Sequence, residues 1–223
     1  IRKTTCVIDI CGARIMSASS AQAGPAAGGG FCGASVLAFP IFMAWQVREE
    51  SVDVIEYITG NRINYGIMMV GGTRRDITPD MFPRIDKSLK YYEDIFAKMG
   101  NLFLNDKTIH MRCRNTGVLT KQRALELGTV GPTSRASGLA MDVRKDSPYA
   151  AYGDVDFDII LPEVYGQETV GDVYDRIVVR LFEIPQSIGI IRQCMAQMPE
   201  GPVLAEEKYP KLLNGLKKAV GEA

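Results

Sequence analysis

GDVYDRIVVRLFEIPQSIGIIRQC, residues 171–194, is the segment from which the architecture is best predicted. Its large apolar side chains recur at intervals of four and three, which is the period of one face of an α-helix. With the residues that follow, this face consists of Ile177, Leu181, Ile184, Ile188, Ile191, Met195 and Met198. The pattern predicts one long helix over Asp172–Met198. Pro185 lies inside it and lacks a backbone N–H, so we expect it to kink the helix or split it in two.

Helical periodicity recurs in three further segments. Apolar residues at helical spacing predict one helix over Ala44–Thr59 and another over residues 78–100, which Gly100 closes. Threonine is a typical N-cap residue, so we expect a short helix over Thr120–Leu127. A last amphipathic segment covers Glu206–Val220. Helices therefore account for most of the predicted structure.

Short strands have room at three places, near Ile63–Val70, Thr108–Cys113 and Asp156–Leu161. The predicted fold class is mainly α, a helical bundle core with a few short β-strands. In domain terms we expect a helical core over residues 41–203 and an amphipathic tail over residues 204–223. Residues 1–40 are rich in Gly, Ala and Ser, so we expect a flexible segment that is not one continuous native stretch.

Composition and charge exclude several classes of protein. The chain has 223 residues, and Lys+Arg and Asp+Glu both number 26, which gives a formal net charge of +0. A neutral balance argues against a nucleic-acid partner, because such binding rests on clustered positive charge. The longest nearly apolar run, Ala34–Trp45, is shorter than the roughly 20 residues that a membrane span needs. We therefore expect a globular protein with no nucleic-acid partner and no membrane span.

Five cysteines and one histidine limit the metal chemistry of the chain. The cysteines are odd in number, irregularly spaced and without a CxxC pair, so neither a disulfide framework nor a zinc site is expected. A single histidine, His110, cannot build a histidine-based metal site, and we expect it on a partly exposed strand or loop. A self-contained metalloenzyme is therefore not expected.

Arg74, Arg75 and Asp76 form the first group of charged residues with a possible function. They follow Gly71 and Gly72, a turn that lets the backbone come close to another group. One interpretation is an exposed turn. The other is a set of donors directed at an anion, a cofactor or a carbonyl group of a partner.

The second charged group lies on the polar side of the long helix and comprises Asp172, Arg176, Arg180 and Glu183. Spacings of three and four are typical of a solvated ladder of ion pairs on a helix. Alternatively, Arg176 and Arg180 reach into the irregular segment Gly131–Pro148 and hold its acids, Asp142 or Asp146, because Arg–carboxylate pairs are suited to fixing a loop. Both interpretations remain open. The candidate loop-holding residues are Arg135, Asp142, Arg144, Arg176 and Arg180.

Four strings of this sequence resemble a known superfamily in their order and approximate spacing. They are EYITGNRINYGIMMVGGTRRDI (56–77), GTVGPTSRASGLAMDVRKDSPYAAY (128–152), VDFDI (155–159) and GDVYDRIVVRLFEIPQSIGIIRQC (171–194). From about Phe42 to Val203 the chain resembles the large subunit of membrane-bound, energy-converting nickel–iron hydrogenases. The homologous quinone-site subunit of respiratory complex I is similar as well. The string NRINYG favours the hydrogenase branch.

The resemblance implies a mainly helical subunit in the peripheral, cytoplasmic arm of a membrane complex. Such a subunit packs against a small iron–sulfur subunit and contacts the membrane subunits only indirectly. It would place Arg74, Arg75, Asp76 and Asn64 near the iron–sulfur cluster of that partner. In the hydrogenase branch a nickel–iron centre hangs from two cysteine pairs. The complex I branch has lost both pairs, binds quinone in the corresponding cleft and carries a histidine at the place of Asn64.

The same resemblance implies that the metal ligands of this chain are incomplete. Cys11 is the only candidate relic of the first cysteine pair, because Arg14 stands where the second cysteine would fall. The second pair is expected beyond Glu222, so we expect a fragment, truncated at both ends, whose nickel–iron centre needs the full-length enzyme.

Three interpretations of function follow from the resemblance. The preferred one is a fragment of the large, catalytic subunit of an energy-converting hydrogenase, which passes electrons between the iron–sulfur partner and protons or hydrogen. The first alternative is a quinone-site subunit of an NADH:quinone oxidoreductase. The second is a non-catalytic scaffold that binds the iron–sulfur subunit. In each case the chain alone is expected to be inactive.

Overall fold

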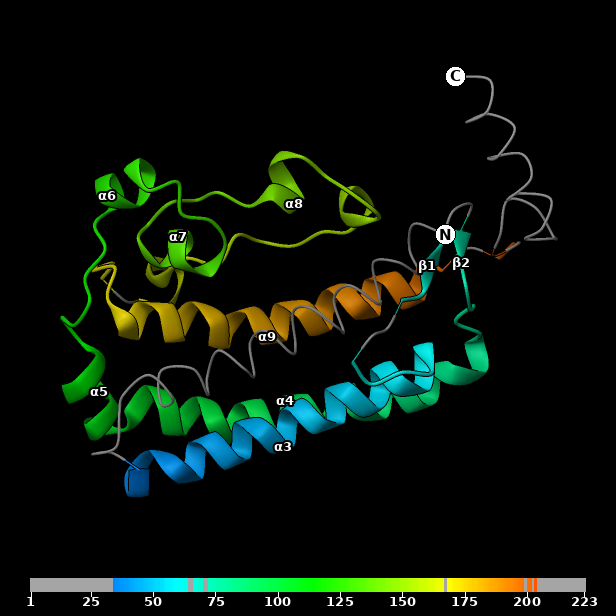
Figure 1. Ribbon diagram of the computed structural model, residues 1–223, viewed down its shortest axis with the longest axis horizontal. Coiled ribbons are helices and arrows are strands. Elements are labelled where there is room, and N and C mark those ends of the chain that lie inside the picture. Colours follow the sequence, from blue (N-terminus) through cyan, green and yellow to red (C-terminus); the bar gives the residue numbers. More distant parts are fainter. Residues whose placement is uncertain are drawn as a thin grey trace.

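Within the part of the chain that the computed structural model describes, three long helices form the framework of the fold (Figure 1). The structure describes residues 34–63, 66–69, 72–166, 168–198, 200, 201 and 203. The long helices are α3 (Ala34–Thr59), α4 (Phe82–Asn105) and α9 (Val173–Ala196). Helix α4 packs against both α3 and α9. The predicted mainly α class is therefore confirmed.

Short elements connect the long helices. They are β1 (Met68–Met69), β2 (Gly72–Thr73), η2 (Pro79–Met81), α5 (Lys107–Cys113), α6 (Lys121–Glu126), α7 (Pro132–Ala136), α8 (Val143–Asp146), η3 (Tyr152–Asp154) and η4 (Pro162–Tyr165). The strands form an antiparallel hairpin in which Met68 lies opposite Thr73. Helices α6, α7 and α8 lie on the side of α9 away from α3 and α4 (Figure 1), and α7 packs directly on α9. We call residues 120–166 and 168–170 the α6–α8 layer. Helix α9 is therefore the central helix, with this layer on one side and α3 and α4 on the other.

The structure corrects two predicted helix boundaries and confirms a third helix. Helix α3 begins at Ala34, well before the predicted start at Ala44. Helix α4 continues through Gly100 to Asn105, because one glycine costs a helix only about 1 kcal/mol and packing can outweigh that. The short helix predicted after Thr120 is α6, and the Thr120 hydroxyl accepts a hydrogen bond from the backbone N–H of Arg123.

Of the three predicted strand regions, only the one near Ile63–Val70 contains a described strand, namely β1. Thr108–Cys113 was expected to be extended but belongs to helix α5. The reason is a cap, because the Asp106 carboxylate accepts hydrogen bonds from the first free N–H groups of this helix at 2.7 and 3.0 Å. Asp156–Leu161 has no regular secondary structure. His110 consequently lies on a helix and is half-buried.

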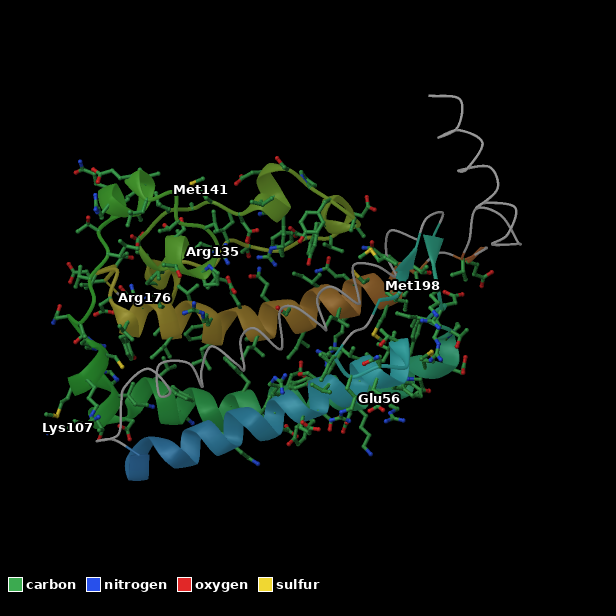
Figure 2. The ribbon with its side chains drawn as sticks, viewed as in Figure 1. Glu56, Lys107, Arg135, Met141, Arg176 and Met198 are labelled. Carbon is green, nitrogen blue, oxygen red and sulfur yellow. The ribbon has the colours of Figure 1, made fainter. Side chains whose placement is uncertain are left out.

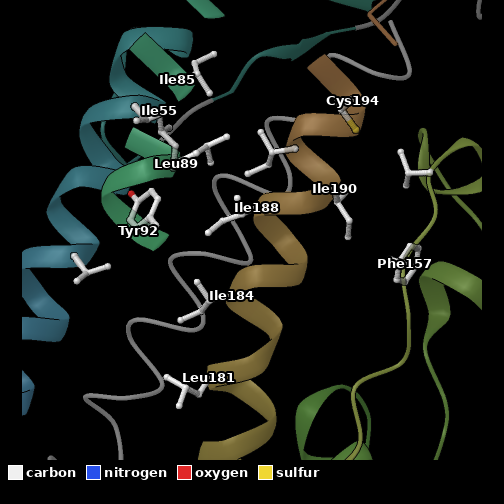
Figure 3. Packing of buried hydrophobic residues seen from close by; sticks show 14 of the residues in the cluster. Ile55, Ile85, Leu89, Tyr92, Phe157, Leu181, Ile184, Ile188, Ile190 and Cys194 are labelled. Atoms are coloured by element: carbon white, nitrogen blue, oxygen red, sulfur yellow. The ribbon is translucent and has the colours of Figure 1, made fainter. Parts of the chain in front are cut away.

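Helix α9 is buried on two sides. Ile184 and Ile188 lie on the side predicted from the sequence, toward α3 and α4 (Figure 3). Ile190 lies on the opposite side, toward Phe157 of the α6–α8 layer (Figure 3). Val179 belongs to a second, smaller apolar cluster that includes a residue of α7. Burial of this helix from both sides is the main apolar contribution that holds the α6–α8 layer together with α3 and α4.

Helix α9 continues through Pro185, so of the two expected effects, a kink or a split, the split is wrong. Pro185 is exposed, and it deprives the Leu181 carbonyl of its usual N–H donor. One turn further on, the Ser187 hydroxyl donates to the Glu183 carbonyl at 2.7 Å. Burial along the rest of the helix offsets the lost backbone bond, which keeps the two halves of α9 in one element.

Polar contacts join the three long helices in pairs. The hydroxyl groups of Ser51 in α3 and Tyr92 in α4 share a buried hydrogen bond of 2.6 Å. Arg192 of α9 donates to both carboxylate oxygens of Glu93 in α4 at 2.6 and 3.0 Å. The second pair is exposed and contributes little to stability, so the apolar core carries the packing of the three helices.

Candidate functional site

Two arginines and two carboxylates form a buried charge cluster between the α6–α8 layer and α9. Arg135 of α7 is almost completely buried and lies between α7 and α9 (Figure 2). Its Nε donates to Oε1 of Glu183 in α9 at 3.0 Å, and its Nη2 donates to the same oxygen. Its Nη1 lies 3.2 Å from Oδ2 of Asp142 and donates to the Met141 carbonyl at 3.3 Å. One guanidinium thus links α7, the start of α8 and α9.

Arg144 completes the buried charge cluster from α8. Its Nε donates to Oδ1 of Asp142 at 2.9 Å, and its guanidinium lies 4.7 Å from the centre of the Phe157 ring. Burial raises the pKa of Asp142, but the hydrogen bonds and charges of Arg144 and Arg135 together lower it by more. The pKa of Asp142 therefore lies below its ordinary value.

The prediction that Arg176 and Arg180 hold Asp142 or Asp146 is wrong. Arg176, labelled at one end of α9 in Figure 2, donates to the carbonyl oxygens of Gly117 and Gly171 at 2.9 and 3.0 Å. Arg180 donates to the Arg176 carbonyl at 3.3 Å. Of the five candidate loop-holding residues, the structure brings Arg135, Asp142 and Arg144 together and leaves these two outside the cluster.

The alternative of a solvated charge ladder is also wrong for its two carboxylates. Asp172 is 3% exposed and Glu183 is 7% exposed. Asp172 caps α9, where its Oδ1 accepts from the Asp175 N–H at 2.9 Å. The polar side of α9 faces α7 instead of water. In the ion pair between Arg135 and Glu183, the arginine therefore comes from α7 and the carboxylate from α9.

The start of α9 is fastened to the segment that follows α5. The Leu119 N–H donates to the Gly171 carbonyl at 2.8 Å, and the Val173 N–H donates to the Thr116 carbonyl at 3.1 Å. Gly171 has a φ of +81°, and a Cβ at this position would lie 2.3 Å from the Leu119 carbonyl oxygen. Only glycine fits here, because any side chain would meet backbone. These bonds close the base of the α6–α8 layer.

Arg74, Arg75 and Asp76 lie directly after β2 and are exposed. The Arg74 N–H donates to the Ile67 carbonyl at 2.7 Å, which extends the hairpin by one bond. The Asp76 carboxylate accepts from the N–H of the next residue at 2.9 Å. Two other predicted site residues, Asn64 and Cys11, lie outside the described residues, as does the predicted tail over 206–220.

Within the described part of the chain, no group of three or more His, Cys, Asp or Glu side chains could hold a metal ion. Cys113 is half-buried and Cys194 is fully buried, and neither forms a disulfide with another residue that the structure describes. The centres of the His110 and Tyr174 rings lie 4.7 Å apart with the rings tilted by 45°, and the His110 Nε2 lies 2.6 Å from the Leu104 carbonyl oxygen. These residues do not fit a nickel–iron centre, which needs several thiolate ligands, and we assign no catalytic step to such a centre.

Glu183 is the partner in the buried charge cluster that sequence reasoning missed. The sequence pattern predicts a solvated position for it, because acids on amphipathic helices are usually exposed. One signal was available, since Glu183 stands directly between Phe182 and Ile184 in an almost wholly apolar turn. A lone acid in such a turn is typical of a buried ion pair.

Known proteins that are similar to the chain define its class. It is 38% identical over 172 residues to the membrane-bound hydrogenase subunit alpha of Pyrococcus furiosus, a match that covers 77% of this chain and 40% of the relative. It is 35% identical over 176 residues to a subunit of the NADH-quinone oxidoreductase of Desulforamulus reducens, covering 79% and 45%. A chain in the structure of the membrane-bound sulfane sulfur reductase, an archaeal respiratory membrane complex, matches with a TM-score of 0.77 and 29% identity, covering 91% and 51%. The class is a helical subunit of the kind found in membrane-bound oxidoreductase complexes.

The family profile described as the respiratory-chain NADH dehydrogenase, 49 Kd subunit, matches residues 37–221. The chain belongs to this family. The resemblance predicted from the four sequence strings is therefore confirmed. The chain spans less than half the length of the two curated relatives above. Among the described helices, none combines the length and apolar character that crossing a membrane requires.

Proposed function

We propose that the chain is part of the large subunit of a membrane-associated, energy-converting nickel–iron hydrogenase. The full enzyme would transfer electrons between an iron–sulfur partner subunit and protons or hydrogen. The observation that carries the proposal is the 38% identity to the membrane-bound hydrogenase subunit alpha over 77% of the chain. In this proposal the nickel–iron centre belongs to the full-length enzyme, and the complex lies on the cytoplasmic side of the membrane.

The residues of this chain would act by binding and positioning the small iron–sulfur subunit. Arg74 and Arg75 are exposed after β2, and a cation near an iron–sulfur cluster favours the reduced, more negative state. Asp76 and Asn64 belong to the same segment and would lie close to that cluster. The buried charge cluster would keep the α6–α8 layer in a fixed position on α9, because breaking a buried ion pair is costly.

A quinone-site subunit is the second candidate. The 35% identity to the NADH-quinone oxidoreductase relative supports it, over 79% of the chain. In that case the same helical core would contact a quinone head group instead of supporting a metal centre. The third interpretation is a scaffold without redox chemistry. Such a scaffold would bind the same iron–sulfur partner subunit as the hydrogenase and the quinone-site candidates.

Co-expression of the full-length large subunit, which would supply the remaining thiolate ligands, with the small iron–sulfur subunit of the same source separates these candidates. The purified complex would be analysed for nickel and iron and tested for reoxidation of the reduced cluster by a soluble quinone. Stoichiometric nickel supports the hydrogenase proposal, and iron without nickel together with quinone-dependent reoxidation supports the second candidate. Capture of the partner with neither property leaves the scaffold.

Failure to capture the partner would contradict all three candidates. A matched control tests the predicted surface. Arg74→Glu should weaken capture at least tenfold, whereas Arg123→Glu, a change on exposed helix α6, should leave it unchanged. Equal effects of the two substitutions would contradict a contact at Arg74.

A further inference from the structure

The two consecutive arginines after β2 have different surroundings. The guanidinium of Arg75 covers Gly60, the residue that ends α3. A Cβ on Gly60 would lie 2.8 Å from Nη1 of Arg75 and 2.9 Å from its Cζ and Nη2. Neither arginine side chain has a hydrogen bond or ion pair with a residue that the structure describes, and of the two only Arg75 lies against Gly60. Arg75 therefore has a contact with the end of α3 that is not found for Arg74 in the described part of the chain.

The C-terminal end of α3 attracts a cation. The last carbonyl groups of a helix carry partial negative charge, and the last turn of α3 contains no basic residue. Gly60 has a φ of +84°, and its N–H donates to the Glu56 carbonyl at 2.7 Å, which is a left-handed helix ending. Because Gly60 has no Cβ, the face of the Arg75 guanidinium can lie against the backbone. Arg75 thus supplies the positive charge that α3 itself lacks.

A second arginine ties the same segment to α3 at its other end. The Nη1 of Arg62 lies 2.5 Å from Oδ1 of Asp53 and 2.8 Å from Oε2 of Glu56, and its Nη2 pairs with Glu49. These three acids are spaced by four and three residues and share one face of α3. Arg62 thus fixes the beginning of segment 60–76, and Arg75 fixes its end.

We propose that Arg62 and Arg75 are positioning residues that hold the β1–β2 hairpin on the C-terminal end of α3. Arg74 is then the arginine that contacts the electron-rich group of a partner, an iron–sulfur cluster or its thiolate ligands. The role of Arg74 rests on the proposed function. Arg75 acts through its contact with Gly60, and this positioning role can be measured on the isolated chain.

Hydrogen–deuterium exchange of the hairpin amides tests the positioning role in the isolated chain. Arg75→Gln should speed exchange of the Arg74 amide, which donates to the Ile67 carbonyl, about tenfold, and Arg74→Gln should not. Arg75→Lys should restore part of the protection, because it keeps a cation at the helix end. If Arg74→Gln and Arg75→Gln have equal effects, or if neither has an effect, the positioning role is overturned.

A double-mutant cycle tests whether Arg75 acts through Gly60. Gly60→Ala should displace the guanidinium, so Arg75→Gln should add little exchange in that background. Gly128→Ala is the matched control, because it has a similar φ of +59° with nothing within 4 Å of its Cβ, and it should leave the hairpin unchanged. Fully additive effects of Gly60→Ala and Arg75→Gln would contradict the contact.

The complex with the small iron–sulfur subunit tests the role of Arg74. Arg74→Gln should lower the reduction potential of the partner's cluster, read by redox titration of its electron paramagnetic resonance signal, while hairpin exchange stays unchanged. A potential that moves with Arg75→Gln and not with Arg74→Gln would reverse the assignment. If the unmodified chain captures no partner, the proposed function fails, and the exchange data on the isolated chain still decide the positioning role.

Discussion

Ser134 is fully buried in α7, and its hydroxyl has no hydrogen-bond partner in the part of the chain that the structure describes. A buried polar atom without a partner costs about 1–3 kcal/mol. We therefore expect Ser134→Ala to raise the free energy of unfolding by about 1 kcal/mol in urea denaturation. Ser137→Ala is the matched control, because Ser137 is also buried but donates to the Thr133 carbonyl at 3.3 Å. An equal gain from both substitutions would contradict the explanation.

The contribution of Asp142 makes the stability of the buried charge cluster depend on pH. Its pKa is lower in the folded protein than in the unfolded chain, so its contribution to stability is complete above the ordinary aspartate pKa of about 4. That contribution is lost as pH falls through the lower, folded-state value. Asp142→Asn keeps the cap and removes the charge. We expect the unfolding free energies of the unmodified protein and this variant to differ most near neutral pH, and the difference to begin to shrink below about pH 4.

Asp175 titrates in the opposite sense and has to be separated from Asp142. Burial raises the pKa of Asp175, although its carboxylate accepts hydrogen bonds from the N–H groups of Val170 and Gly171. Its contribution therefore falls as pH rises through the interval between the unfolded and folded values. Because Asp175 is present in both proteins, its contribution cancels in the difference. A difference that stays constant from about pH 7 to about pH 3 would show that Asp142 is not stabilised by its arginines.

At the scale of elements, α7 depends on its ion pair with α9. A helix of five residues is not stable alone, and Arg135 is the side chain that joins it to Glu183. Arg135→Met leaves two buried carboxylates without this partner, and we expect a loss of about 3–5 kcal/mol in urea denaturation. Arg123→Met removes an exposed pair on α6 and should cost less than about 1 kcal/mol.

A double variant separates the ion pair from simple loss of packing. Arg135→Met combined with Glu183→Leu removes both charges, so it should be more stable than Arg135→Met alone. A double variant less stable than either single one would show that packing volume, and not charge, is what α7 requires.

Helix α9 shows why apolar spacing in a sequence reveals only one of the two buried sides of a central helix. Ile184 and Ile188 recur at helical spacing, and this local pattern correctly predicted the side toward α3 and α4. The other side carries Glu183, a residue type usually found at exposed positions. It is buried because Arg135 reaches it from 48 residues away, and a contact of that range leaves no periodic trace in the sequence. The irregular loop pointed to Arg135 and Asp142 as structural residues, but not to their partner.

At the scale of the molecule, many of the large apolar side chains that are exposed in the described part of the chain belong to the α6–α8 layer. Leu125, Leu127, Val130, Met141 and Val143 are between 51% and 73% exposed. Soluble monomers rarely expose large apolar patches, so we expect the isolated chain to self-associate, as measured by light scattering. Leu127→Gln with Val130→Gln should lower the apparent mass. Met111→Gln changes an exposed residue on α5 and should not, although its side chain is 76% exposed.

The family was predictable from the sequence, whereas the division of roles within it was not. Four strings in register carried the resemblance, and a family profile over residues 37–221 agrees with it. Arg74 and Arg75 are neighbours in the sequence and look equivalent there. They differ because Arg75 meets a helix end formed many residues earlier, a contact that depends on how the hairpin folds back on α3.

The bonds that fasten Leu119 to Gly171 and Thr116 to Val173 make the α6–α8 layer a module with its two ends held at a fixed separation. Closing a loop costs only about 0.6 kcal/mol more for each doubling of its length. Insertions or deletions inside the module therefore need not disturb the register of α4 against α9. Evolution could replace the surface that such a subunit offers to its complex while the three-helix frame, and whatever depends on its geometry, stays the same.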